Sequence, residues 1–427
     1  MAPRNFLLSS LLCTLYLLFA SSLDDAEYFA LKSIYESTRG EHWTWAYTSL
    51  LTGFEWNFQN NENPCSHEHR WQGIHCNEQD KVFRLNLDNL NLNGTLPDSF
   101  GNFTELKYLY ILGQNPQLHG VIPNSIGSLA QLIDIRIHGR IGLSGSITFL
   151  ESLYNLEKIR LYDLGVSGPF PDLSNSIGLE EIYIKNTQVY GSIAEGMTRL
   201  ENLKTVWMFE NKLSGSIPSG FGQLSTSLQD LRLYTNRLTG SIPDSLGLSI
   251  ALETLQLEKN QLNGSIPVSF GSLRHIKNLT LFMNKLTGSI PEFTDTSELT
   301  QLYLFTNQLS GQIPTSIGSL PKLKELALQD NLLNGQLPES FFSEDGGSNL
   351  QNLYLFNNKL SGSIPASFTK LVNLIRLVLH SNMMTGGLGV ISSLKNLSVL
   401  VVNHNRFSGA RKQSIYTDSH SPLLHVS

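Results

Sequence analysis

A glycine recurs at a nearly constant interval along most of this chain, within the pattern Leu-x-x-Leu-x-Leu-x-x-Asn-x-Leu-x-Gly-x-Ile-Pro. Successive glycines are 23 to 27 residues apart. A period of this length is typical of a solenoid, in which each repeat forms one coil that stacks on its neighbours, and solenoids bind partners along a long curved face. The glycines are Gly94, Gly120, Gly145, Gly168, Gly191, Gly215, Gly240, Gly264, Gly288, Gly311, Gly335, Gly362, Gly386 and Gly409.

Each repeat is predicted to contribute one short strand and several buried leucines. An apolar residue stands two, seven, nine and twelve positions before the glycine; in the repeat ending at Gly240 these are Leu238, Leu233, Leu231 and Leu228. Because side chains alternate along a strand, both leucines of Leu-x-Leu point inward. We expect the strands to pair in parallel as one long sheet on the concave side. No coil buries enough apolar surface alone, so the stack is predicted to stabilise itself cooperatively.

An asparagine four positions before the glycine is predicted to be structural. The chain turns out of the strand there and leaves backbone groups that need partners. An inward Asn has two donors and an acceptor group for the backbone of adjacent coils, and leaving such groups unpaired would be costly. Leu90, Leu164 and Thr187 replace it in early repeats. The asparagines of this ladder are Asn211, Asn236, Asn260, Asn284, Asn307, Asn331, Asn358, Asn382 and Asn405.

Residues 1–22 have the features of a secretory signal. Arg4 is followed by an apolar run from Phe6 to Phe19, and small residues come next. The run is short for a membrane span, so we expect cleavage near Leu23 rather than an uncleaved anchor helix. No other stretch could span a bilayer. The sequence therefore predicts a secreted or cell-surface protein.

Residues 23–81 do not repeat and are predicted to form an N-terminal cap. Asp24 to Thr38 is expected to be an amphipathic helix that stops at Gly40. Four tryptophans follow and are predicted to seal the apolar end of the solenoid. The apolar face of the helix is predicted to hold Ala26, Phe29, Ala30, Ile34 and Tyr35, and the tryptophans are Trp43, Trp45, Trp56 and Trp71.

Two cysteines, Cys65 and Cys76, remain outside the signal, and an oxidising compartment favours a disulfide between them. The alternative is a zinc site that would recruit His67, His69 and His75, but the spacing matches no known finger. The chain also has glycosylation sequons, which fit a secreted glycoprotein. These begin at Asn93, Asn102, Asn263, Asn278 and Asn396.

Composition and motifs exclude several classes of function. The net charge is -6 and only 15% of residues are charged, without a basic block, so nucleic acid is not an expected partner. There is no Gly-x-Ser-x-Gly elbow, no His-Glu-x-x-His and no P-loop. Carboxylates such as Glu181, Glu210 and Glu258 are interpreted as solvated charges on an exposed face. The sequence predicts no catalytic activity, no metal and no cofactor.

The variable positions of each strand are the candidate ligand site. Residues eight and six positions before the glycine should point outward on the concave face, toward water. The first column holds Arg160, Tyr183, Trp207, Arg232, Gln256, Thr280, Tyr303, Ala327, Tyr354 and Val378. The second column holds Tyr162, Lys185, Phe209, Tyr234, Glu258, Phe282, Phe305, Gln329, Phe356 and His380.

Large aromatic residues are not expected at positions that face water unless they have a role there. One explanation is that they stack on one another and stiffen the sheet; the other is that they form a platform for a protein loop or sugar rings. A glycan on Asn278 would restrict access nearby. The predicted ligand-binding residues are Tyr183, Trp207, Phe209, Arg232, Tyr234, Phe282, Tyr303, Phe305, Tyr354 and Phe356.

The repeat resembles the plant-type leucine-rich repeat, since Leu-x-Gly-Ser-Ile-Pro occurs at 213–218, 238–243, 262–267, 286–291 and 360–365. Cys65 with the segment Trp71-Gln72-Gly73-Ile74-His75-Cys76 resembles the N-terminal cap of that family, and the preceding helix resembles that of algal and protist members. The resemblance implies an α/β solenoid, a right-handed curved superhelix with a parallel concave sheet and a helical cap.

The family includes ectodomains of receptor-like kinases, receptor-like proteins and polygalacturonase inhibitors. The chain departs from it in having neither a kinase nor paired C-terminal cysteines. About 14 coils are expected over residues 82–411, followed by a disordered tail, 412–427. We expect a secreted, non-catalytic recognition protein that binds a protein or glycan on its concave face as a partner of a membrane receptor. Inhibition of a cell-wall-degrading enzyme, or a structural role at the cell surface or wall, are the alternatives.

Overall fold

The computed structural model describes residues 23–45, 53–59, 62–113, 115–139, 141–293, 298–339, 349–408 and 415–416. They fall into two compact units, residues 1–171 and 172–427, which are described one at a time. The predicted signal, residues 1–22, and most of the predicted tail lie outside the described residues.

The predicted cap helix is confirmed as α2 (Asp25–Ser37), with Asp24 accepting a hydrogen bond from the Ala26 N–H at 3.0 Å. Its buried face includes Ala30, Leu31 and Ile34. The prediction that Ala26 and Phe29 belong to this face is wrong, since both are exposed, Phe29 by 63%. At 3.6 residues per turn, position 29 lies to the side of the stripe made by 27, 30, 31 and 34.

The tryptophans of the cap form a buried cluster, as predicted. Trp43, Trp56 and Trp71 are at most 5% exposed, while Trp45 is half-buried. Trp56 stacks on Trp71 with ring centroids 5.9 Å apart, and its Nε1 donates to the Gln72 carbonyl at 2.8 Å. The indole rings therefore bury apolar area at the end of the coils while one N–H of the cluster keeps a partner.

The predicted disulfide joins Cys65 and Cys76, whose Cα atoms are 5.5 Å apart. Among the described residues, no group of His, Cys, Asp and Glu side chains could hold a metal ion. The geometry thus favours the disulfide over the zinc alternative for this segment.

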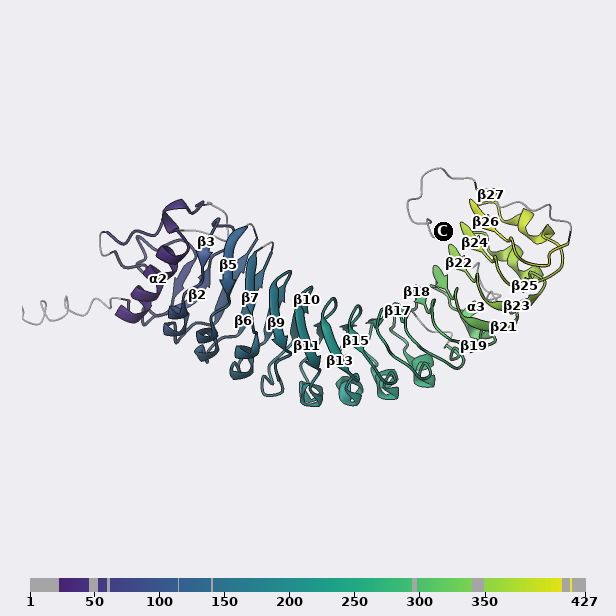
Figure 1. Ribbon diagram of the computed structural model, residues 1–427, viewed down its shortest axis with the longest axis horizontal. Helices are drawn as coiled ribbons and strands as arrows, with labels where there is room; N and C mark the ends of the chain where they lie inside the picture. The colour runs from purple at the N-terminus through teal and green to yellow at the C-terminus, as the bar shows by residue number, and fades with distance from the viewer. Residues whose placement is uncertain are drawn as a thin grey trace, which may run out of the picture. The chain divides into compact units, whose positions relative to one another are not determined.

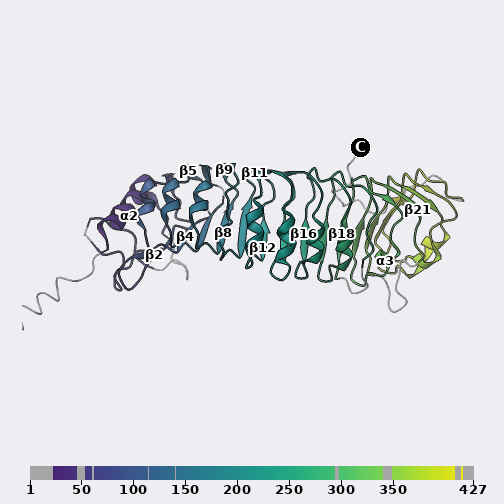
Figure 2. The same cartoon turned by 90° about the horizontal axis from the view of Figure 1, so that it is seen from below.

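Each coil adds one strand to a main sheet (Figures 1 and 2). Within 1–171, β1 pairs antiparallel with β2 and the later strands are parallel. Within 172–427, all neighbours from β10 to β26 are parallel. The first unit has β1 (Ile74–Cys76), β2 (Val82–Asn86), β4 (Tyr108–Leu112), β6 (Asp134–His138) and β8 (Lys158–Tyr162). The second has β10 (Glu181–Lys185), β12 (Thr205–Trp207), β14 (Asp230–Arg232), β16 (Thr254–Gln256), β17 (Asn278–Thr280), β18 (Gln301–Tyr303), β20 (Glu325–Ala327), β22 (Asn352–Tyr354), β24 (Arg376–Val378) and β26 (Val399–Val401).

Further strands pair at the Leu-x-Gly segments, which the sequence analysis did not predict as strands. In 1–171 these are β3 (Asn93–Thr95), β5 (Gln117–Val121), β7 (Gly142–Gly145) and β9 (Gly165–Pro169). In 172–427 they are β11 (Gln188–Ser192), β13 (Lys212–Gly215) and β15 (Arg237–Leu238), then β19 (Ser310–Gly311), β21 (Leu332–Gln336), β23 (Lys359–Gly362) and β25 (Met383–Met384). Gly240 shows why the repeat needs glycine beside these strands, because its φ of +77° strains other residues.

Many coils have a short helix on the side opposite the main sheet (Figure 1). In the cap and first unit they are η1 (Gly40–His42), η2 (Asp98–Asn102), η3 (Asn124–Ser128) and η4 (Thr148–Ser152). In the second unit they are η5 (Glu195–Arg199), η6 (Ser219–Leu224), η7 (Asp244–Leu248), η8 (Val268–Ser272), α3 (Thr315–Gly318), η9 (Ala366–Lys370) and η10 (Gly389–Ser393).

The core is a stack of apolar layers, as the repeat predicts. Leu228, Leu231, Leu233 and Leu238 are all fully buried. In the parallel register Leu231 lies beside Leu255, so equivalent leucines contact from coil to coil. Burying each such side chain stabilises the fold by roughly 1.5–3 kcal/mol.

The Asn ladder joins adjacent coils, as predicted. Asn260 accepts from the Leu238 N–H of the preceding coil at 3.0 Å. Its amide donates to the carbonyls of Leu233, in the preceding coil, and Leu257, in its own coil, both at 3.0 Å. Where the early repeat lacks this Asn, Asn115 accepts from the Leu92 N–H at 2.9 Å and so takes the same role one position earlier.

The predicted disordered tail is wrong for two residues. Ile415–Tyr416 form β27, which pairs antiparallel with β26. An unpaired strand edge exposes a row of N–H and C=O groups, and a returning segment covers them. The end of the main sheet in 172–427 therefore has a strand that the repeat pattern does not predict.

The residue before each ladder position has a left-handed backbone, with φ between 51° and 59°. This conformation costs a non-glycine residue roughly 1–2 kcal/mol, least for Asn and Asp. The coils from Asp163 onward thus carry a strained turn at the same place, whereas two earlier coils have glycines there, Gly113 and Gly139. The residues are Asp163, Asn186, Glu210, Thr235, Lys259, Met283, Thr306, Asp330, Asn357, Ser381 and His404.

Substitution of a ladder residue tests its structural role. We expect Asn260→Ala to destabilise the chain by about 2–4 kcal/mol, because several buried backbone groups lose their partners at about 1–3 kcal/mol each. Thermal and urea unfolding followed by circular dichroism measure this. The exposed Gln261→Ala is the control and should unfold like the parent. Equal unfolding of both variants would contradict the structural role.

Relief of the strained turn should stabilise the chain. Thr306 is exposed and β-branched at φ +52°, where Asn357 occupies the same position in another coil. We expect Thr306→Asn to raise the unfolding free energy by about 1 kcal/mol, since Asn tolerates this conformation. Thr306→Val keeps the branched side chain and should bring no gain. A melting temperature of Thr306→Asn at or below that of Thr306→Val would refute the strain.

Candidate functional site

The predicted ligand-binding residues lie together on the outward face of the main sheet in 172–427. We name this set the ring surface: Tyr183, Trp207, Phe209, Arg232, Tyr234, Phe282, Tyr303, Phe305, Tyr354 and Phe356. Strand pairing places the first predicted column in register, since Tyr183 lies beside Trp207 and Trp207 beside Arg232. The same register continues through Gln256, Thr280, Tyr303, Ala327, Tyr354 and Val378.

Rings of the second column stack from coil to coil. Phe209 and Tyr234 are parallel with centroids 4.3 Å apart, and Phe282 and Phe305 are parallel at 4.2 Å. Such pairs stabilise by about 0.5–1.5 kcal/mol beyond their buried area. The rings are nevertheless only half-buried. Stacking therefore accounts for part of their presence and leaves one side of each pair open to a partner.

The prediction that every outward position faces water is wrong at four residues. Thr280, Ala327 and Val378 are 3–4% exposed and Glu258 is 7% exposed. Thr280, Ala327 and Val378 each stand in register beside a larger ring on an adjacent strand, Tyr303 or Tyr354. Sequence alone gives the direction of a side chain, whereas its exposure depends on the size of the neighbours on adjacent strands.

A third outward column, ten positions before the glycine, holds charged partners of the rings. Asp230 accepts two hydrogen bonds from Arg232, at 2.8 and 2.7 Å, and holds the guanidinium 4.3 Å from the Trp207 ring centroid. The Tyr303 hydroxyl donates to Glu325. Burial, followed by the Glu325 carboxylate, raises the pKa of Tyr303 far above its ordinary value. Strand alternation alone predicts this column, because residues ten and eight positions before the glycine point to the same face of the sheet.

Two buried polar atoms of this face have no hydrogen-bond partner among the described residues: Trp207 Nε1 and Gln329 Oε1. Buried polar groups are normally paired, and an unpaired one costs about 1–3 kcal/mol. The Trp207 N–H lies within the ring surface, so an acceptor on a bound molecule would remove that cost.

Glu258 is the buried carboxylate of the face, in the same column as Tyr234 and Phe282. Burial raises its pKa, while a hydrogen bond from the Thr280 hydroxyl at 2.5 Å and the charges of Lys259 and Arg232 lower it. Burial also raises the pKa of Tyr234, to about 12, with help from the carboxylates of Glu210 and Glu258. The centre of the face therefore favours neutral, hydrogen-bonding side chains.

In 1–171 the outward face differs from the prediction because the counting fails there. Tyr110 and Arg136 lie in register with Arg160, and His138 with Tyr162. Counting back from Gly120 and Gly145 misses Tyr110, Arg136 and His138, because those repeats contain one or two more residues between strand and glycine than the others. The Leu-x-Leu pair is part of the strand itself, so counting from it identifies the outward positions in these repeats as well. Arg136 lies 4.7 Å from the Tyr110 ring centroid, and His138 stacks on Tyr162 at 4.0 Å.

Asp88 follows β2 on this same face and was not singled out from the sequence. It accepts from the Leu112 N–H at 2.8 Å. Burial raises the pKa of its carboxyl to about 6, against the lowering effects of Leu112, Asn86 and the Arg136 charge. Asp88 therefore titrates close to neutral pH.

The predicted glycosylation sites differ in exposure. Asn263 and Asn396 are exposed, whereas Asn93, Asn102 and Asn278 are half-buried. Asn278 belongs to the third outward column, in β17, and accepts a hydrogen bond from the Thr300 hydroxyl at 3.4 Å. A glycan there would stand on the face, as expected; its presence stays a prediction.

None of the helices in the described part of the chain is long and apolar enough to cross a membrane.

Comparison with known proteins confirms the resemblance of the repeats. The family model described as Leucine Rich Repeat matches residues 202–224, 227–248, 251–273, 298–320 and 349–371. Receptor-like protein 39 of Arabidopsis thaliana is 41% identical over 68 residues, which are 16% of this chain and 8% of that protein. This chain thus carries leucine-rich repeats and is similar to a plant receptor-like protein over a small part of the latter's length.

Solved plant receptors share the fold. The structure of PEPR1 with AtPEP1 has a TM-score of 0.76 and 29% identity, covering 89% of this chain and 52% of that chain. The plant peptide hormone receptor RGFR1 in complex with RGF2 has a TM-score of 0.70 and 34% identity, covering 74% of this chain and 50% of that chain. The chain therefore spans about half the length of these solved relatives.

The titration of Asp88 should appear in the stability. Since its folded pKa of about 6 lies above the ordinary 3.8, its protonation stabilises the fold below pH 3.8, and that contribution is lost as the pH rises through 6. We expect the melting temperature of Asp88→Asn, relative to the parent, to rise between about pH 5 and about pH 7.5. The exposed Asp98→Asn is the control and should show no such change. A constant difference for Asp88→Asn across this range would contradict the raised pKa.

Proposed function

We propose that this chain is an extracellular, non-catalytic recognition protein that binds a protein ligand, in the form of an extended peptide segment, across the ring surface of 172–427. In this proposal it acts as a partner of a membrane receptor. The observation that carries the proposal is the buried Nε1 of Trp207, which has no hydrogen-bond partner in the described part of the chain and lies within a row of half-buried rings. Such a donor favours a bound acceptor, and a peptide carbonyl is one.

The chemistry of the sheet favours recognition by side chains. The backbone groups of β12 to β24 pair with neighbouring strands, so a ligand meets the side chains above them. Aromatic residues supply large contact area at low entropic cost, and rings that already stack lose little further freedom on binding. The stacks at Phe209–Tyr234 and Phe282–Phe305 are pre-organised in this sense.

The comparisons support a peptide over a glycan. The solved structures of RGFR1 and PEPR1 hold RGF2 and AtPEP1, and RGFR1 is named a peptide hormone receptor. This chain spans about half of those chains, and a membrane receptor as partner is a part of the proposal that the capture experiment below tests.

The second candidate is a structural surface protein whose rings only stiffen the sheet. The coil-to-coil stacking of Phe209 on Tyr234 favours it. In that case the rings would matter for stability and no ligand would be found. The two functions therefore predict different effects for a substitution that keeps an aromatic ring at this position and removes the N–H donor.

Trp207→Phe is that substitution. With the secreted protein immobilised, capture from native extracellular fluid and mass spectrometry identify the ligand, whose affinity is then measured by calorimetry. We expect Trp207→Phe to weaken binding by about tenfold, the loss of one hydrogen bond of 1–1.5 kcal/mol. Its melting temperature should change little, because removal of an unpaired buried donor offsets the packing that the smaller phenyl ring loses.

Tyr190→Ala is the matched control, since Tyr190 is 50% exposed and lies in β11, away from the main sheet. It should bind like the parent. Loss of stability in Trp207→Phe without any captured ligand would favour the structural function. A ligand that binds Trp207→Phe and the parent equally would remove the Trp207 donor from the site.

A further inference from the structure

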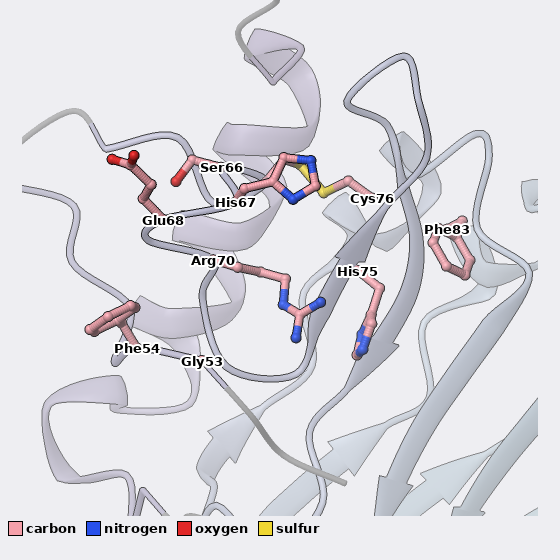
Figure 3. A pocket seen from close by; sticks show the side chains of 10 residues that line it. Gly53, Phe54, Ser66, His67, Glu68, Arg70, His75, Cys76 and Phe83 are labelled. Atoms are coloured by element: carbon pink, nitrogen blue, oxygen red, sulfur yellow. A yellow bond between two sulfur atoms is a disulfide. The ribbon is translucent and has the colours of Figure 1, made fainter. Parts of the chain in front are cut away.

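A pocket of about 460 Å³ opens in the cap of 1–171 (Figure 3). The disulfide of Cys65 and Cys76 forms part of its wall, and Phe54 and Phe83 add aromatic surface. Its volume lies in the range of small-molecule sites, about 300–1,000 Å³. The polar side chains in its lining are Ser66, His67, Glu68, Arg70 and His75.

Positive groups converge on one side of this pocket. Figure 3 shows the Arg70 guanidinium and the His75 imidazole directed into the same space, while the Glu68 carboxylate points away from both. His75 lies in β1, directly across from Arg84 in β2. Residues directly opposite in an antiparallel pair share a face of the sheet, with Cβ atoms about 4.5–5.5 Å apart. Arg84 therefore adds a second guanidinium beside the imidazole.

Two nitrogens of this group are buried without a hydrogen-bond partner in the described part of the chain: His75 Nδ1 and Arg84 Nε. The Arg84 guanidinium lies 4.6 Å from the Tyr108 ring centroid, and that contact gives Nε no acceptor. Guanidinium N–H groups only donate, so Arg84 Nε requires an acceptor. Arg84 is not among the residues that line the pocket, so its part in the site rests on its position directly across from His75. An anion between Arg84, His75 and Arg70 would supply the acceptor.

We propose that this end of the first unit is a binding site for a carboxylate, the C-terminal carboxylate of a peptide being the source that fits its walls. The carboxylate would accept hydrogen bonds from Arg70, Arg84 and protonated His75. Phe54 and Phe83 would contact the apolar side chain of the terminal residue. The Phe54 ring already lies 5.4 Å from the His69 ring, centroid to centroid, and is still 53% exposed, so part of it is open to such a contact.

The electrostatics of His75 agree with this geometry. Burial, followed by the charges of Arg70 and Arg84, lowers the pKa of His75 below its ordinary value of 6.5. A bound carboxylate would favour the imidazolium, so binding should strengthen as the pH falls through the pKa of His75. The other charged or titratable groups of the lining are His67 and Glu68, both on the exposed loop.

N-acetylphenylalanine and its amide are a matched pair of probes, because they differ only in the carboxylate. Calorimetric titration of the full secreted chain should show saturable binding of the acid and none of the amide. We expect Arg70→Gln and Arg84→Gln each to weaken binding of the acid by about 10- to 100-fold, the loss of a charge-assisted hydrogen bond. His75→Gln should remove the pH dependence.

Glu68→Gln is the control, since it removes a negative charge from the rim and should bind the acid at least as well. An unchanged melting temperature and an intact disulfide show that each variant is folded. Acetate separates the two sources of carboxylate: binding at least about tenfold weaker than N-acetylphenylalanine supports a peptide terminus, the aromatic contact being worth more than about 1.4 kcal/mol.

Three results would overturn the proposal. They are equal binding of acid and amide, no saturable binding of the acid, and unchanged binding in folded Arg70→Gln and Arg84→Gln. Acetate that binds as tightly as N-acetylphenylalanine would overturn the peptide terminus. Because these probes do not involve Trp207 or Tyr234, failure here leaves the ring surface untouched, and failure there leaves this pocket untouched.

Discussion

The hydrogen bonds of the Asn ladder are the interaction on which the rest of the structure depends. Asn260 bonds the backbone of its own coil and that of the coil before it, through Leu257 and Leu233. Each coil is thereby fixed in register on its predecessor, and the main-sheet strands inherit that register. The ring surface depends on the same bonds. A shift of one residue would reverse every outward side chain, and the 4.3 Å stack of Phe209 on Tyr234 could not form. The structural positions of the repeat therefore fix the register of the coils, and this register aligns the variable positions into one continuous surface.

Much of this fold could be predicted because one period specifies both the buried and the outward positions. The leucines at Leu231 and Leu233, the Asn ladder, the cap helix and the disulfide all followed from spacing or resemblance, and the structure confirms them. The failures have local causes. Extra residues before Gly120 and Gly145 separate the glycine from the strand. Counting from the glycine therefore did not identify Tyr110 and Arg136 as outward positions. Burial of Thr280 depends on neighbours 24 or so residues away, whose size the periodic pattern does not encode. The pocket beside Arg70 lies in the cap, where no period exists to guide a prediction.

The outward faces of the two units differ in chemistry. In 172–427 the face is aromatic, and its charges are mostly neutralised on the face itself, as Asp230 neutralises Arg232. In 1–171 the outward positions hold Arg84, Arg136 and Arg160, with Asp134 bonded to Arg136. A ligand for the face of 172–427 would be selected by shape and ring contact, whereas the face of 1–171 favours a negatively charged ligand. Both have buried nitrogens without a partner among the residues that the structure describes, at Trp207 on one and at His75 and Arg84 on the other. A stack of coils with many redundant bonds tolerates such a cost of about 1–3 kcal/mol for each group.

Stiffening of the sheet and binding of a ligand are compatible roles for the same rings. A flexible aromatic side chain would lose about 0.5–1.5 kcal/mol of conformational freedom when a ligand immobilises it. In Phe282 and Phe305, which lie parallel at 4.2 Å, that loss has already occurred on folding. The stack leaves the outer side of the rings open, because both are only half-buried. Stacking in the free protein is thus what a pre-organised binding surface requires. Stability measurements alone report the stacking energy and not the binding of a ligand. The Trp207 N–H donor contributes nothing to stacking, so its substitution distinguishes the two roles better.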